Sequence, residues 1–196
     1  MAIQPPKPST ALKKGTLASV IGIAAAALVL QTVPEDESGR HVKVTVAQDG
    51  TATVKHVRGP QYLRAYFDLA GIPTACDGIT KGVKMGQVYT EAQCAMLLER
   101  ELVVHAQGVM NCSPGLRGDG RDNQRAAAVS LAYNIGVGGY CRSTAAKRFN
   151  AGNYRGGCDA FMAWNKARVN GVLRPVQGLT NRRARERALC IKGLPA

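Results

Sequence analysis

The sequence is poor in aromatic and acidic residues, and it lacks the usual spacings of a metal or nucleotide site. Aromatic residues make up 5% of its 196 residues, and tryptophan occurs once. Its six cysteines form no C-x-x-C pair, and its three histidines do not fall at the spacing of zinc ligands. The sequence also has no phosphate-binding glycine loop and no Ser–His–Asp order. We therefore expect neither a metal site nor a cofactor.

The shortage of acidic residues leaves a strongly basic chain. Its 26 lysines and arginines against 13 acidic residues give a formal net charge of +13. Such a charge attracts polyanions, including nucleic acid, an anionic membrane face and bacterial wall polymers. The positive residues are scattered except in 182–187, without the basic stripe and stacking aromatics of a nucleic-acid site. We therefore expect no nucleic-acid partner, and we interpret 182–187 as a solvated helix face with an Arg182–Glu186 pair.

The cysteines indicate the compartment in which the protein works. An even number of cysteines in a basic chain favours disulfides and an oxidising environment. The alternative is a cytosolic protein in which free thiols are buried as small core residues. Six cysteines allow fifteen complete pairings, so the sequence by itself leaves the connectivity open.

One uncharged stretch is long enough to cross a membrane. Residues 15–33 contain no charged side chain, and nineteen helical residues span about 28 Å, close to the ~30 Å of a hydrocarbon layer. Lysines before it and acidic residues after it favour a cytoplasmic tail at 1–14. Many of its residues are small, which lowers the cost of leaving the membrane. We expect a releasable anchor; a permanent anchor, a cleaved signal peptide and a buried helix are the alternatives.

A β-hairpin is predicted directly after this stretch. In residues 41–57 valines alternate with polar residues on both sides of Asp49-Gly50, a pair that favours a tight two-residue turn. Pairing around that turn places Val42 opposite Val57.

The next stretch carries the candidate chemistry. Residues 62–80 combine one carboxylate, Asp68, with a hydroxyl at Thr74 and with glycine turns, in a pattern of short strands. The rest of the chain is predicted to form helices, which we expect to begin at Thr90, Asp122 or Asn123, Ser143 or Thr144, Cys158 and Thr180. The helix from Cys158 is expected to end at Lys166. This order predicts an α+β fold.

The 62–80 stretch resembles the active-site stretch of the phage-type lysozymes (glycoside hydrolase family 24), especially their membrane-tethered signal-anchor-release endolysins. The residues in register are Ala65, Tyr66, Asp68, Gly71, Thr74, Cys76, Gly78 and Thr80, followed by 133–136, 142–144, 163–166 and 178–190. The resemblance implies a lysozyme-like domain over 34–196. It would have a small β-containing N-terminal lobe and a mostly helical C-terminal lobe, with 41–57 as an inserted hairpin.

The resemblance also implies an activity and a site. The expected enzyme hydrolyses β-1,4 bonds of peptidoglycan between N-acetylmuramic acid and N-acetylglucosamine during host lysis. Asp68 is the expected catalytic carboxylate, Thr74 holds water or sugar, and Tyr66 and Asn134 shape the cleft. The disulfides implied are Cys76–Cys94, Cys112–Cys141 and Cys158–Cys190.

The family's catalytic glutamate has no counterpart at the matching position. Counting back from Asp68 places it at Arg58-Gly59, and neither residue can donate a proton to a glycosidic oxygen. One hypothesis is that Glu37 replaces it. The other is that Glu37 belongs to a solvated acidic cluster or pairs with Arg58, in which case the protein is a catalytically impaired, peptidoglycan-binding or regulatory relative.

The resemblance finally implies partners and a location. We expect a monomer that binds peptidoglycan and is held in the inner membrane by residues 15–33, with its N terminus cytoplasmic and its domain periplasmic. After release it would act in the periplasm. A chain that lacks residues 1–33 is expected to be a soluble protein.

Overall fold

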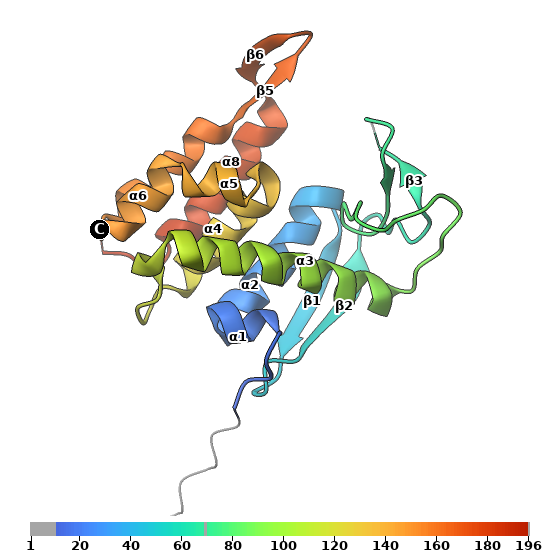
Figure 1. The fold of residues 1–196 in the computed structure, drawn as a ribbon, viewed down its shortest axis with the longest axis horizontal. Helices are drawn as coiled ribbons and strands as arrows, with labels where there is room; N and C mark the ends of the chain where they lie inside the picture. The colour runs from blue at the N-terminus through green and yellow to red at the C-terminus, as the bar shows by residue number, and fades with distance from the viewer. Residues whose placement is uncertain (1–10, 69, 196) are drawn as a thin grey trace, which may run out of the picture.

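The computed structural model describes residues 11–68 and 70–195, so most of the expected cytoplasmic tail 1–14 lies outside the described residues. Figure 1 shows the fold. In chain order the elements are α1 (Leu17–Ile21), α2 (Ile23–Ser38), β1 (His41–Val46), β2 (Ala52–Arg58), β3 (Tyr66–Phe67), β4 (Pro73–Thr74), α3 (Glu91–Cys112), η1 (Pro114–Leu116), α4 (Asp122–Ile135), α5 (Val137–Cys141), α6 (Thr144–Asn150), α7 (Tyr154–Asp159), η2 (Ala160–Trp164), β5 (Lys166–Val169), β6 (Val172–Pro175) and α8 (Gln177–Ile191).

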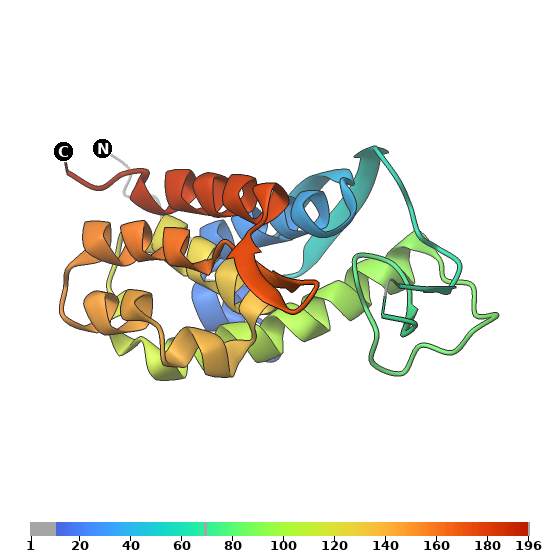
Figure 2. The same ribbon diagram turned by 90° about the horizontal axis from the view of Figure 1, so that it is seen from above.

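The molecule consists of a helical body and a smaller β lobe, as expected for a lysozyme-like α+β fold. The β lobe is the segment 61–89, which holds β3 and β4. Figure 2 shows α3 running from this lobe into the helical body, where α8 and the helices before it pack. The strands form antiparallel pairs, β1 with β2, β3 with β4 and β5 with β6.

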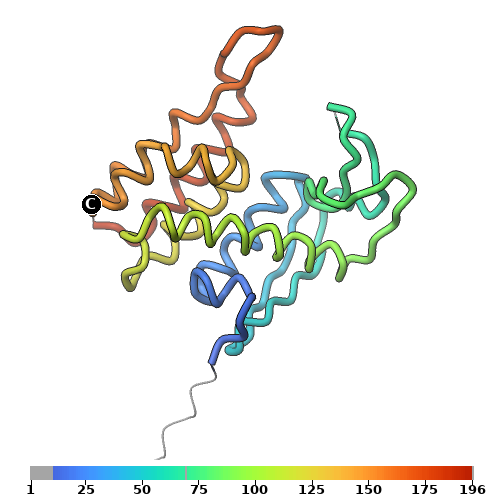
Figure 3. Tube along the Cα trace, viewed as in Figure 1, coloured from blue at the N-terminus to red at the C-terminus, as the bar shows by residue number. Residues whose placement is uncertain are grey.

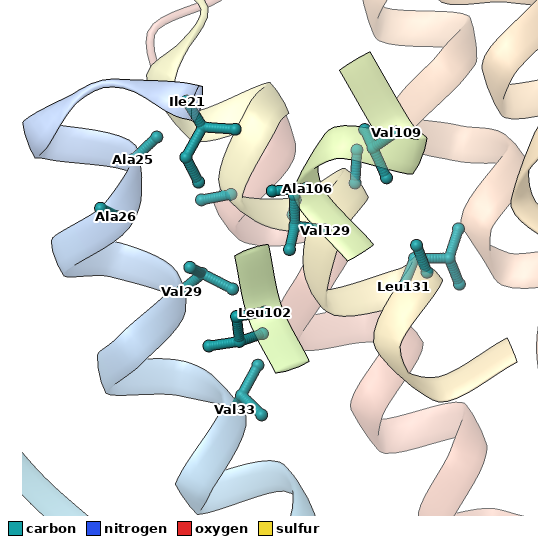
Figure 4. Packing of buried hydrophobic residues seen from close by; sticks show 14 of the residues in the cluster. Ile21, Ala25, Ala26, Val29, Val33, Leu102, Ala106, Val109, Val129 and Leu131 are labelled. Carbon is teal, nitrogen blue, oxygen red and sulfur yellow. The ribbon is translucent and has the colours of Figure 1, made fainter. Parts of the chain in front are cut away.

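The helices of the uncharged stretch lie inside the helical body. Leu17, Ile21, Val29, Leu30 and Val33 are at most 2% exposed and belong to the main hydrophobic core. Figure 4 shows side chains of α1 and α2 converging with those of α3 and α4. The small side chains on α2 allow it to approach α4 closely, and so a weakly apolar helix packs well here.

This placement differs from the expected domain boundary at residue 34. Residues 17–33 supply a large part of the core, so the folded domain described here includes them. Gly22, with φ of +89°, separates α1 from α2. Within the described residues, no helix has both the length and the apolar character needed to cross a membrane.

The predicted β1–β2 hairpin is present, with a different register. Val42 lies opposite His56 rather than Val57, and Val46 pairs with Ala52. The reason is that the connection is a five-residue loop, 47–51, closed by a hydrogen bond from the Ala47 N–H to the Thr51 carbonyl. Asp49 and Gly50 lie inside this loop instead of forming a two-residue turn.

The hairpin loop also holds the chain that precedes α1. Lys13 donates its backbone N–H to the Asp49 carbonyl at 2.7 Å, and its Nζ lies 2.9 Å from the Asp49 carboxylate. The pKa of Asp49 is lowered to about 2, first by the side-chain hydrogen bond from Lys13 and then by hydrogen bonds from Thr51. A Cβ at Gly50 would come within 2.8 Å of the Thr16 hydroxyl, so the loop and the start of α1 are in close contact.

Helix starts follow the predicted caps in two cases and differ in two others. Thr90 forms the expected capping box with Gln93, and Ser143 caps α6. In contrast, α7 begins at Tyr154, four residues before the expected Cys158, and α8 begins at Gln177, three residues before the expected Thr180, while α4 begins at Asp122 as expected.

The structure contains a β5–β6 hairpin where a helix was expected to reach Lys166. Lys166 opens β5, and the hairpin turns at Asn170-Gly171, which have φ of +52° and +80°. Asn-Gly between two apolar runs is a strong hairpin signal, so this element was present in the sequence and was overlooked.

The three disulfides implied by the resemblance are all present, joining Cys76 to Cys94, Cys112 to Cys141 and Cys158 to Cys190. They link the β lobe to α3, α3 to α5, and α7 to α8.

The core position of residues 17–33 reverses the expectation for the chain that lacks residues 1–33. We now expect that deletion to unfold the domain, because it removes several fully buried side chains. The milder Leu30→Ala is expected to lower the free energy of unfolding by about 2–5 kcal/mol. Thermal and urea denaturation of both forms would measure this, with the exposed Gln31→Ala as the control. A cooperative, wild-type transition in the truncated chain would contradict the prediction.

Candidate active site

A pocket of about 260 Å³ opens where the end of α2, the β lobe, α3 and α4 meet. Figure 3 traces the chain from α2 through the β1–β2 hairpin and the β lobe before it enters α3. The pocket is lined by Glu37, Gly78, Ile79, Thr80, Lys81, Glu101, His105, Tyr133 and Asn134. This lining is polar, and it places two carboxylates, Glu37 and Glu101, at one cavity.

Glu37 occupies the last turn of α2. The helix ends at Ser38 and is capped by Gly39, which adopts the left-handed conformation with φ of +71°. The Glu37 carboxylate is 21% exposed and accepts a 2.6 Å hydrogen bond from Arg182 Nη1. Gly78 faces it closely, since a Cβ there would lie 3.6 Å from Glu37 Oε2. The carboxylate is therefore fixed on one side and open to the pocket on the other.

Buried arginines of α8 hold two of the pocket residues. Arg182 contacts Glu37, while Arg183 Nη2 donates to Asn134 Oδ1 at 3.1 Å. Both arginines also bind Glu186, which accepts from Arg182 Nε at 3.1 Å and from Arg183 Nη2 at 3.0 Å. Ser130 donates a further hydrogen bond to Glu186. Because all these groups are interconnected, the positions of Glu37 and Asn134 depend on each other.

The charge of Arg182 is maintained by its carboxylate neighbours. Burial lowers the pKa of Arg182, but the attraction of Glu37 and Glu186 outweighs it, and the net pKa is raised.

Tyr133 forms a partly buried wall of the pocket. Its pKa is raised, first by burial and then by the negative charges of Glu37, Asp77 and Glu101. The hydroxyl donates to the Asp77 carbonyl at 3.3 Å, and the ring lies 5.1 Å from that of His105. Tyr133 therefore stays protonated and serves as a hydrogen-bond donor.

The expected residues of the β lobe, Tyr66, Asp68 and Thr74, are not among those that line this pocket. Asp68 Oδ1 accepts the backbone N–H groups of Ala70 and Ile72, both at 2.9 Å. Thr74 is 3% exposed and donates its hydroxyl to the Ile72 carbonyl at 3.0 Å. Both side chains are thus engaged within the β3–β4 hairpin, and Thr74 has little surface for a ligand.

Tyr66 belongs to the same strand pair as Thr74 and does not line the pocket. It pairs with Thr74 in the β3–β4 sheet. Its pKa is raised by burial first, and then by the charges of Tyr62, Asp68, Asp77 and Glu37.

The structure therefore brings Glu37 and Asn134 together in one pocket, whereas Tyr66, Asp68 and Thr74 belong to the β3–β4 hairpin. Neither Arg58 nor Gly59, the expected place of the family's glutamate, lines the pocket. The hypothesis that residues 35–37 form a solvated acidic cluster is also wrong, because the Asp36 side chain is 4% exposed and is bound by Arg185.

The sequence interpretation missed the role of α8. The Arg182–Glu186 pair is present at 3.1 Å, but both side chains are buried instead of solvated. The signal was the spacing: Arg182 and Arg183 lie four and three residues before Glu186, so one carboxylate can bind both.

In the described parts of the chain, no group of three or more His, Cys, Asp or Glu side chains is arranged to hold an ion. What the pocket offers is carboxylates beside hydrogen-bond donors, the groups that acid–base chemistry on a polar substrate uses.

Comparisons with known proteins agree on one family. The family model of phage lysozyme matches residues 58–186. The chain is 32% identical to a SAR-endolysin of bacteriophage PS119 over 187 residues, covering 94% of this chain and 97% of that protein. It is 38% identical to a SAR-endolysin of Pseudomonas phage phiKMV over 129 residues, covering 65% and 78%. The fold is similar to the endolysin from Escherichia coli O157:H7 phage FAHEc1, with a TM-score of 0.67, 29% identity, and coverage of 86% and 94%.

The buried network of Arg182, Arg183, Glu37 and Glu186 is expected to stabilise the fold. Replacing Arg182 by Met leaves the carboxylates of Glu37 and Glu186 without a shared cation. We expect a loss of about 3–5 kcal/mol in the free energy of unfolding, the usual cost of breaking a buried charge pair. Arg187→Met is the matched control on the same helix; its ion pair with Asp159 is exposed, so its cost should be about 1 kcal/mol or less. Equal losses in urea denaturation would contradict the prediction.

Proposed function

The chain belongs to the phage lysozyme family as an endolysin of the signal-anchor-release type, and we propose that it hydrolyses the β-1,4 bonds between N-acetylmuramic acid and N-acetylglucosamine in peptidoglycan. The observation that carries this proposal is Glu37, an ion-paired carboxylate at a polar pocket. It supports a glycoside hydrolase over a relative that only binds the cell wall, because glycoside hydrolysis needs an acid at the scissile bond.

Glu37 is the general acid in this proposal. Hydrolysis of a glycosidic bond needs a proton on the leaving oxygen and a second carboxylate that activates water or stabilises the positive charge of the transition state. Asp68 is assigned that second role, and Tyr66 and Asn134 shape the cleft. Thr74 is expected to hold the water or the sugar, which would require the β3–β4 hairpin to expose its hydroxyl.

The β1–β2 hairpin explains why the acid was not found at Arg58-Gly59. The hairpin leaves the body just after Glu37 and returns at Gly59, and a Cβ at Gly59 would come within 2.3 Å of the Gly39 carbonyl. Its two ends are therefore adjacent in space. A family pattern that runs directly from glutamate to Asp68 continues here from Glu37, with the hairpin inserted between.

Substituting Glu37 tests the assignment. Glu37→Gln keeps the size of the side chain but removes the acid, and we expect lytic activity to fall by about 10²–10⁴-fold. Turbidity loss of permeabilised Gram-negative cells would measure activity, and peptidoglycan pull-down would show that binding is kept. Glu35→Gln is the matched control on the same helix, where the carboxylate is 46% exposed and only approaches His41. Normal clearing by Glu37→Gln would rule out this role.

We further propose that residues 15–33 first anchor the protein in the inner membrane, with its domain in the periplasm, and that the protein then leaves the membrane as a periplasmic monomer. Similarity to SAR-endolysins and the uncharged run of small residues support this route. While residues 15–33 span the membrane, Glu37 is held four residues from their end and away from the pocket. The anchored form is thus inactive in this proposal.

The contact between Lys13 and Asp49 is informative here. In an anchored chain Lys13 is on the cytoplasmic side and the β1–β2 loop is on the periplasmic side. In the described fold they are 2.9 Å apart. This fold therefore corresponds to the released form in the proposal.

Release can be tested with positions that are exposed in the folded domain. Ser19, Ala24 and Gln31 are exposed on α1 and α2. Changing all three to Leu makes the segment more apolar, so we expect the protein to stay in the membrane fraction and lysis to start later. The control changes Ser19 and Ala24 to Gln and keeps Gln31, which should hasten release. Cell fractionation and the onset of lysis are the measurements. The same membrane fraction in both variants would refute the release route.

A further inference from the structure

A buried ion pair outside the pocket lining joins the end of α2 to the β lobe. Arg40, three residues after Glu37, and Asp77, three residues after Thr74, are 4% and 1% exposed. The Arg40 guanidinium donates from Nε to Asp77 Oδ1 at 3.0 Å and from Nη2 to Asp77 Oδ2. This two-point geometry fixes the orientation of both side chains as well as their separation.

Further contacts converge on the same aspartate. Ser38 Oγ lies 2.9 Å from Asp77 Oδ1, and the Asp77 carbonyl accepts the Tyr133 hydroxyl. Asp77 thus binds the end of α2 through its carboxylate and the end of α4 through its backbone.

The aspartate sits in a tight turn that faces Glu37. Residues 75–79 form this turn, and Ala75 and Ile79 exchange two backbone hydrogen bonds of 2.9 Å. Cys76 ties the turn to α3 through its disulfide. Gly78, the residue after Asp77, faces the Glu37 carboxylate. Movement of the turn would therefore change the wall directly opposite Glu37.

We propose that Arg40 and Asp77 are positioning residues for the reaction: their ion pair holds turn 75–79 against the end of α2 and so sets the distance between Glu37 and the β lobe. This role rests on the proposed function of Glu37. Arg182 fixes Glu37 within the helical body, and the Arg40–Asp77 pair fixes the β lobe relative to it. Both constraints are needed to align an acid with a bond held by residues of the other lobe.

Replacing both Arg40 and Asp77 distinguishes an effect of the ion pair on catalysis from an effect on folding. Arg40→Met combined with Asp77→Leu leaves no unpaired buried charge, and such apolar replacements are often tolerated. We expect a folded protein whose kcat falls by about 10–100-fold, because small misplacements of catalytic groups have effects of this size. KM should change far less. Arg40→Lys keeps the charge but loses the two-point contact, so its kcat should be intermediate.

The matched control removes the ion pair at the other end of α4. Arg125→Met combined with Asp122→Leu breaks a 2.7 Å pair remote from the pocket, and kcat should stay at the wild-type value. If the Arg40/Asp77 double variant keeps wild-type kcat in its folded fraction, the pair is only structural and the proposal is overturned.

If that variant does not fold, Ser38→Ala, which removes the hydrogen bond from Ser38 to Asp77, provides the test. A severalfold lower kcat supports the proposal, and wild-type kcat overturns it.

Hydrogen exchange gives a readout that does not depend on activity. The backbone N–H groups of Ala75 and Ile79 should exchange faster in the double variant, while those of α4 remain protected. Unchanged protection at these two amides would also overturn the proposal. A wild-type protein without muramidase activity would instead refute the proposed function, and exchange would still show whether the pair holds the turn.

Discussion

The packing of α2 against α3 and α4 is the constraint on which the site depends. Glu37 reaches the pocket only because the apolar face of the preceding helix is buried in the body. The segment must satisfy two requirements: it is uncharged throughout 15–33, and it is rich in small side chains that permit close packing. Larger apolar residues would suit a membrane better, but they would not fit between helices packed at the density of a protein interior.

Charge is distributed unevenly between the interior and the surface. Three acidic residues near the site are bound by arginines: Glu37 and Glu186 by Arg182, and Asp77 by Arg40. In a chain of net charge +13, these pairs place scarce carboxylates at the junction of the two lobes and leave a basic exterior. A basic exterior favours approach to an anionic polymer, whereas the paired interior charges fix geometry. The composition therefore contributes to both binding and positioning.

Features set by local chemistry could be predicted from the sequence, and features set by tertiary contacts could not. The Thr90 capping box and the Ser143 cap follow from neighbouring residues, and both are present. The burial of Arg182 was missed, because it depends on Glu37, which is 145 residues away in sequence. The inserted hairpin 41–57 and the candidate Glu37 were expected from the sequence, whereas the close approach of the two hairpin ends, at Gly39 and Gly59, depends on tertiary structure and could not be predicted.

The pocket can be assembled only when α2 is packed in the helical body. Glu37 is bound from the body by Arg182, and the turn opposite it is bound through Arg40, which also follows α2 in the chain. A conformation that places α2 elsewhere removes Glu37 from the pocket, releases the β lobe from Arg40 and opens the core at once. Partial assembly would leave Arg182 and Asp77 buried without their partners, which is costly. The active site should therefore form together with the folded core, in one cooperative step.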